Sequence, residues 1–101
     1  MGGPSIVARR LREARKRTGV SQRKIGIKAG INESTASTRI NQYERGKHMP
    51  GLHIVARLAA VMRMPVPYFY CQDKELADVI VKFSTLGETQ RKRLLGSMDE
   101  L

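Results

Sequence analysis

The sequence predicts an all-α protein. Apolar residues recur three or four positions apart along most of the chain, which is the period of helices with one buried face. Serine, asparagine or aspartate precedes several of these segments, and glycine or proline follows most of them, as at helix starts and ends. No stretch shows strand alternation with hairpin turns. The 101 residues suffice for one domain, or for one small domain with an appendage.

The first expected helix covers residues 6–18. Ser5 is suited to cap its N-terminus, because a serine hydroxyl can accept a hydrogen bond from a free backbone amide there. Leu11 and Ala14 fall on one face at helical spacing. Gly19 is a good helix stop.

A second, shorter helix is expected between Ser21, as its N-cap, and Gly30, which can supply the positive φ of a helix end. Ile25 and Ala29 are spaced to bury one face. Gly26 lies in the middle, where glycine is less favourable than alanine by about 1 kcal/mol. A glycine at this position suggests that a second helix approaches closely.

The third expected helix begins after Asn32 as N-cap and closes at Gly46. Ala36, Ile40 and Tyr43 share a narrow arc and are expected to pack in the core. The opposite face is polar and mostly short, so it could lie close to base edges. Its residues are Ser34, Ser37, Thr38, Asn41, Gln42 and Arg45.

The remaining sequence predicts further helices. An apolar stripe marks residues 52–62, and Pro65 ends this segment. Pro67 stands in the first turn of a short fifth helix. Asp73 caps a sixth helix with an apolar face, and residues 88–98 form a final helix.

Positive charge is concentrated in the first half of the chain. The sequence has 19 Lys and Arg against 9 Asp and Glu, a net charge of +10. Residues 1–50 hold 12 basic and 3 acidic residues, whereas residues 51–101 hold 7 and 6. A basic half joined to a near-neutral half indicates a polyanion-binding surface and a separate second function. The alternative is a solvated basic face that contributes only solubility.

The composition also argues against disulfide-bonded, secreted and membrane-spanning proteins. Cys71 is the single cysteine, so no intrachain disulfide can form and we expect a reducing compartment, the cytoplasm. Residues 1–10 have no apolar run typical of a secretory signal, and the apolar stretch at residues 66–71 is too short to span a membrane.

No catalytic or ligand-binding pattern is evident. His48 and His53 lack further ligands at zinc spacing, so no metal site is expected. No Ser/His/Asp set, nucleotide-cradling glycine loop or convincing carboxylate pair appears. We therefore expect no enzyme activity, no cofactor and no small-molecule ligand.

A series of short motifs runs through the first two-thirds of the chain. They are Leu11 with Arg15, Gly19-Val20-Ser21-Gln22, Ile25, Gly30-Ile31, and Tyr43-Glu44-Arg45-Gly46-Lys47 followed by Pro50. In this order they resemble the Cro/CI-type helix-turn-helix regulators, the XRE family. The resemblance implies a lambda-repressor-like five-helix DNA-binding domain over residues 5–71, followed by a C-terminal helical extension over residues 72–101 that serves dimerisation. It also implies a homodimer that binds an inverted repeat in double-stranded DNA.

One departure from the family concerns the interval from Gly30 to Glu44, which is four residues longer than usual. Four residues make about one helical turn. The simplest interpretation is a recognition helix extended at its N-terminus, around residues 33–36. A longer turn before the helix is the alternative.

We expect base contacts from the polar face of the recognition helix. Counted back from Glu44, the positions at which the family reads bases fall on Ser37, Thr38 and Gln42. Glutamine can pair with adenine, and the threonine methyl group can meet that of thymine. The complete set of expected base-contacting residues is Ser34, Ser37, Thr38, Asn41 and Gln42. An ordinary solvated helix face is the alternative.

Contacts to the DNA backbone are expected on either side of this face. The start of the second helix offers backbone amides to a phosphate, and nearby cations can join them. The expected residues are Ser21, Gln22, Arg23, Thr35, Arg39, Arg45 and Lys47. A further basic group is expected to supply mainly a diffuse positive field: Arg9, Arg10, Arg12 and Lys16.

Two half-sites about 34 Å apart are read by a two-fold dimer, so part of the chain must form subunit contacts. The near-neutral second half of the chain is suited to that task. The expected interface residues are Phe69, Leu76, Val79, Ile80, Phe83, Leu94 and Leu95. The alternative is that these residues complete the core of the monomer.

Two questions of role stay open. The longer form with a tail is similar to one group of controller proteins of restriction–modification systems, but a regulator of another operon fits as well. A different class, the antitoxin or partner-binding adaptor, uses the same fold mainly to cover another protein, and an exposed apolar tail over residues 86–101 would suit it. RNA binding is less well supported, since aromatic stacking platforms are absent.

Overall fold

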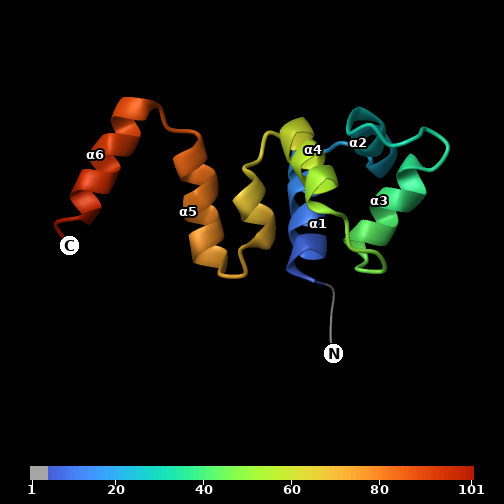
Figure 1. The fold of residues 1–101 in the computed structure, drawn as a ribbon, viewed down its shortest axis with the longest axis horizontal. Coiled ribbons are helices and arrows are strands. Elements are labelled where there is room, and N and C mark those ends of the chain that lie inside the picture. The colour runs from blue at the N-terminus through green and yellow to red at the C-terminus, as the bar shows by residue number, and fades with distance from the viewer. Residues whose placement is uncertain (1–4) are drawn as a thin grey trace.

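The computed structural model describes residues 5–101, and over this range all the regular secondary structure is helical, without strands (Figure 1). This confirms the predicted fold class. The elements, in order, are α1 (Ile6–Thr18), α2 (Gln22–Lys28), α3 (Ala36–Glu44), α4 (Leu52–Met62), the 3-10 helix η1 (Val66–Tyr70), α5 (Lys74–Ser84) and α6 (Glu88–Met98).

Side-chain caps begin three of these helices at the predicted residues. In each case a side-chain oxygen accepts a hydrogen bond from the backbone N–H three residues later, a contact typically worth about 1 kcal/mol. The pairs are Ser5 with Ala8 at 3.2 Å, Ser21 with Lys24 at 3.1 Å and Asp73 with Leu76 at 3.0 Å. Gly19, with a φ of 72°, ends α1 in the left-handed conformation that other residues adopt only with strain.

The hydrophobic core is enclosed by α1–α4 and η1. Each of these elements contributes at least one fully buried side chain, and burial of such a group is worth roughly 1.5–3 kcal/mol. The largest are Leu11, Ile25, Ile40, Val55, Leu58 and Phe69. Tyr43 is buried beside them, as its position on the apolar arc of α3 predicted.

The last two helices project from this core along the long axis of the molecule (Figure 1). Helix α5 packs against η1 and buries Ala77, whereas α6 contributes no buried residue. Figure 1 shows α6 at the opposite end of the molecule from α2 and α3. The helix pair α2 and α3 and the terminal helix α6 therefore lie at opposite ends of the molecule.

Of the four extra residues, 33–35 form a separate turn and only Ala36 belongs to α3, so the expected extension of the helix was wrong. Residues 33–35 make a single turn in which the Thr35 N–H donates to the Asn32 carbonyl at 3.0 Å. The Asn32 side chain caps this turn rather than α3, since its Oδ1 accepts from the Ser34 N–H at 2.9 Å. Thr35, with a φ of −119°, then breaks continuity, and α3 starts at Ala36.

Candidate nucleic-acid interface

Helix α3 directs a polar face away from the core, and α2 packs behind it. Ser37 and Thr38 are exposed near the start of α3, while Asn41 and Gln42 are half-buried further along. Ser34 is exposed in the preceding turn. The structure thus places the expected base-contacting residues on one outward strip, with Ser34 outside the helix itself.

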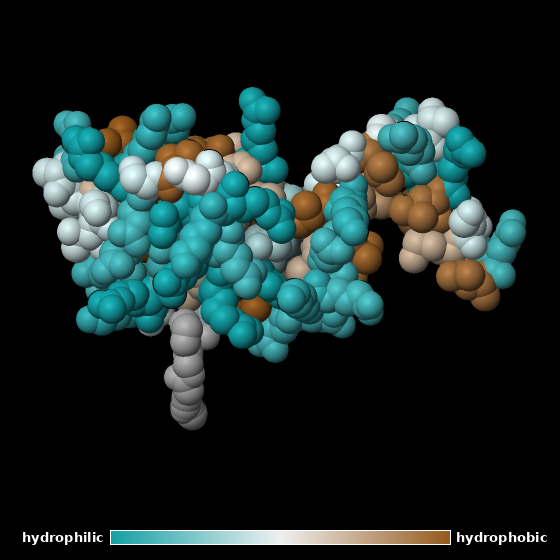
Figure 2. Space-filling view, turned by 180° about the vertical axis from the view of Figure 1, so that it is seen from behind, coloured by the Kyte–Doolittle hydropathy of each residue, from teal (hydrophilic) through white to brown (hydrophobic). Residues whose placement is uncertain are grey.

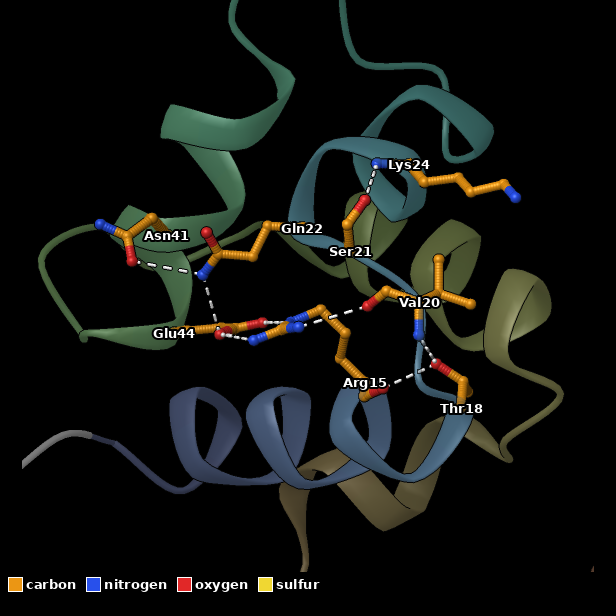
Figure 3. Close-up of polar contacts among 8 residues, drawn as sticks. All are labelled: Arg15, Thr18, Val20, Ser21, Gln22, Lys24, Asn41 and Glu44. Atoms are coloured by element: carbon orange, nitrogen blue, oxygen red, sulfur yellow. Dashed lines mark hydrogen bonds and ion pairs between the residues drawn. The ribbon is translucent and has the colours of Figure 1, made fainter.

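A buried carboxylate fixes α3 against the two helices before it (Figure 3). Glu44 is 6% exposed. Its carboxylate accepts hydrogen bonds from both Nε and Nη2 of Arg15, with Nη2 at 3.0 Å from Oε1. Gln22 donates its amide N–H groups to Glu44 Oε1 at 3.1 Å and to Asn41 Oδ1 at 3.2 Å. Arg15 also donates to the Val20 carbonyl at 3.2 Å. These bonds join α1, α2 and α3 and set the rotation of α3 about its axis.

The opposite charges of Arg15 and Glu44 stabilise each other. The hydrogen bond to Glu44 raises the pKa of the Arg15 guanidinium above its usual value, so Arg15 keeps its positive charge beside the carboxylate. Both residues belong to the sequence motifs described above, but their pairing was not predicted. A signal was available: Glu44 lies four positions after Ile40 on the buried side of the helix, where a carboxylate requires a cation.

Two of the expected DNA contacts are partly used within the protein. Gln22 commits its amide donors to Glu44 and Asn41, which leaves its carbonyl oxygen. Asn41 accepts through Oδ1, so its own N–H groups remain available as donors. Asn41 therefore keeps groups suited to a base acceptor, whereas Gln22 acts mainly on the position of α3.

The residues expected to contact the DNA backbone differ in whether their side chains already have a partner within the protein. Arg39, Arg45 and Lys47 are exposed and form no ion pair within residues 5–101. Arg23 is exposed but donates to Glu33 at 2.7 Å. Two hydroxyl groups have local roles. Ser21 caps α2, and Thr35 donates to the Asn32 carbonyl at 3.3 Å.

Arg10 does not belong to the diffuse positive field expected of α1. It is 6% exposed, and its Nη2 donates to the carbonyls of Cys71 at 2.9 Å and Gln72 at 3.2 Å. It also pairs with Glu13 and lies over the Tyr68 ring. Arg10 therefore attaches the segment after η1 to α1, and a run of arginines in the sequence gives no sign of which one is buried.

The expected dimer residues divide into three groups. Phe69 is 1% exposed in the core, so its assignment to an interface was wrong: η1 packs against α1 and α4, and Phe69 belongs to the buried cluster between them. Ile80 packs against the core, and Phe83 lies under the guanidinium of Arg91 at 4.9 Å. The exposed apolar members are Leu76, Val79, Leu94 and Leu95. Figure 2 shows apolar surface gathered over the projecting extension, beside a largely hydrophilic body.

Neither a metal centre nor a membrane span is evident in residues 5–101. No three or more His, Cys, Asp or Glu side chains in this range are grouped so that they could hold a metal ion. No helix in the same range is long and apolar enough to cross a membrane.

Comparisons with known proteins place this arrangement among helix-turn-helix proteins. The helix-turn-helix domain family matches residues 6–67. A solved structure, described as the crystal structure of transcriptional regulator BswR, is 40% identical, with a TM-score of 0.87. The alignment covers 93% of each chain and so includes most of the C-terminal extension. The search of curated proteins found no match.

Proposed function

The chain belongs to the helix-turn-helix family of DNA-binding transcriptional regulators, and we propose that it recognises a specific inverted repeat as a homodimer. The observation that carries this proposal is the anchoring of α3. The buried Arg15–Glu44 pair fixes its rotation, and the face left outside offers hydroxyl and amide groups. A recognition helix must present such groups to base edges in the major groove.

Free cations border this face and supply the sequence-independent part of binding. Arg39 and Arg45 lie on or directly after α3, and Lys47 follows them. Contacts between these groups and phosphates would fix the register of α3 along the groove, while Thr38 and Asn41 contact bases. This division of roles rests on the exposure and hydrogen bonding of each side chain.

The proposed dimer uses the extension. One such domain makes few base contacts, so a two-fold pair is needed to read two half-sites about 34 Å apart. The exposed apolar residues of α5 and α6, above all Leu76, Val79 and Leu95, provide a surface that water solvates poorly. We place the subunit contact there, at a distance from α3.

The target operon falls into one of two kinds. The resemblance to restriction–modification controllers suggests genes of such a system together with the regulator's own gene. A regulator of another operon would have the same architecture. The genomic position of the selected operator distinguishes the two.

A second candidate function is supported by the same apolar extension. In an antitoxin or adaptor, α5 and α6 would cover a different protein, and DNA binding would be secondary. A regulator should form a stable homodimer alone, whereas an adaptor should aggregate or lose the fold of α6 without its partner.

The experiment is selection from random duplexes at about 150 mM salt, followed by sequencing. An enriched inverted repeat with half-sites one helical turn apart supports the dimeric regulator. Thr38→Ala should relax one position of that motif, whereas Ser97→Ala on α6 serves as a matched control and should change none. Salt-sensitive binding to every duplex without enrichment would contradict sequence-specific regulation and favour the adaptor.

A further inference from the structure

Glu33 is an unusual residue on a surface proposed to bind DNA. Between residues 14 and 72 the sequence contains eleven Lys or Arg residues but only two acidic residues, Glu33 and Glu44. Glu44 is buried and paired. Glu33 is therefore the one exposed carboxylate of this interval, and it lies in the turn that leads into the recognition helix. Phosphates would repel it, so its position calls for a favourable contact that offsets the repulsion.

The Glu33 side chain is held by a cation on the neighbouring helix. Arg23 Nη2 donates to Glu33 Oε2 at 2.7 Å, and the two side chains are 58% and 70% exposed. Pairs this exposed contribute little to folding stability. Oε1 has no hydrogen bond to any residue of the described part of the chain, so one carboxylate oxygen remains available as an acceptor.

The backbone on either side of Glu33 is also ordered by local bonds. Asn32 Oδ1 accepts from both the N–H and the hydroxyl of Ser34, at 2.9 Å and 2.8 Å. Because its proton is used in this bond, Ser34 can offer a base only an acceptor. Thr35 closes the turn by donating to the Asn32 carbonyl. Glu33 is thus presented from a fixed turn rather than from a mobile loop.

We propose that Glu33 is a specificity-determining residue that accepts a hydrogen bond from the N4 amino group of a cytosine in each half-site. The N-terminal end of a recognition helix is the part that reaches base edges. In the major groove cytosine presents only an amino donor, which suits a carboxylate, whereas adenine places the acceptor N7 beside its amino group and guanine and thymine present acceptors that repel it. Arg23 positions the carboxylate and reduces its repulsion by the phosphates.

This inference rests on the proposed sequence-specific binding, and the test separates the two. Random-duplex selection is carried out with the wild-type protein, Glu33→Ala and Glu33→Gln. We expect a cytosine preference of about tenfold or more in the wild type that Glu33→Ala removes at that position alone. Glu33→Gln should move the preference toward adenine, because an amide pairs with the adenine edge.

The matched control is Glu100→Gln, which removes one exposed negative charge after α6 and should leave the motif unchanged. Circular dichroism establishes that the Glu33 variants keep the helical content of the wild type. If the wild-type motif persists at every position in Glu33→Ala, or if affinity changes equally for all sequences, Glu33 is not a base reader and only this inference fails. If the wild type selects no motif, the proposed function fails with it.

Discussion

Gly26 in α2 lies directly against Ala36, the first residue of α3. A Cβ atom at Gly26 would come within 2.9 Å of the Ala36 Cβ and 3.2 Å of the Ala36 carbonyl oxygen. The absence of a side chain at Gly26 therefore sets how closely α2 and α3 pack. Their separation in turn determines where the outward face of α3 lies relative to α2.

Gly26→Ala should destabilise the protein, although alanine favours helix formation by about 1 kcal/mol. The overlap with Ala36 forces the helices apart, and such overpacking typically costs about 1–3 kcal/mol. The free energy of unfolding in urea measures the balance. Gly96→Ala is the control, because a Cβ there meets nothing within 4 Å, and it should stabilise α6. A gain in stability from Gly26→Ala would contradict the close approach.

Much of the fold was predictable because it depends on local bonds. Ser5, Ser21 and Asp73 cap their helices through residues three positions away, so sequence spacing is enough to identify them. Even the close helix approach at Gly26 had a local signal, the cost of glycine inside a helix. The turn before α3 was less predictable, because an Asn32 side chain bonds to the second following amide in a helix cap and in an isolated turn alike.

Prediction from the sequence fails most clearly where tertiary packing decides which residues are buried. Phe69 and Val79 are both apolar residues at helical positions, yet one is buried in the core and the other is exposed. Arg10 and Arg12 are two residues apart, and only Arg10 is buried. Periodicity identifies a face of a helix, but which neighbour covers that face depends on how distant segments pack.

Arg15→Ala should strongly destabilise the fold, because it leaves the buried Glu44 carboxylate without its cation. Loss of one partner of a buried pair typically costs about 3 kcal/mol or more. Urea unfolding gives the magnitude. Arg12→Ala, at an exposed position of the same helix, should stay within about 0.5 kcal/mol of the wild type. Equal stability of the two variants would mean that the Arg15–Glu44 pair does not hold α3 in place.

Alkaline pH should weaken the fold partly through Tyr68. Burial, followed by the charge of Glu13, raises the pKa of this phenol above its ordinary value of 10.0. The folded state thus keeps a proton that the unfolded state releases near pH 10, so stability is lost as the pH rises above about 10. Thermal unfolding between pH 8 and 11 should show a smaller loss for Tyr68→Phe than for the wild type. Tyr70→Phe, at an exposed position, should show the wild-type loss, and identical losses in both variants would contradict this role.

Lys47→Ala should reduce the salt dependence of DNA binding. Lys47 is exposed just beyond α3 and pairs with no carboxylate in the described part of the chain, so we expect it to displace a counterion from one phosphate. The slope of log affinity against log salt should become shallower by about one, because the variant neutralises one phosphate fewer. Lys92→Ala on α6 removes the same charge far from α3 and should keep the wild-type slope. An unchanged slope for Lys47→Ala would show that this residue does not bind a phosphate.

Val79→Asp should separate the proposed dimer without unfolding the monomer. Val79 is 47% exposed on α5, so a carboxylate there stays solvated in the monomer, whereas in an apolar subunit contact it would be buried without a partner. Sedimentation equilibrium should give the monomer mass, and circular dichroism should retain the helical signal. Lys82→Ala, which changes an exposed polar position of the same helix, should remain dimeric. A well-folded dimer of Val79→Asp would show that the subunits meet elsewhere, and the exposed face of α5 would then be free for a different partner.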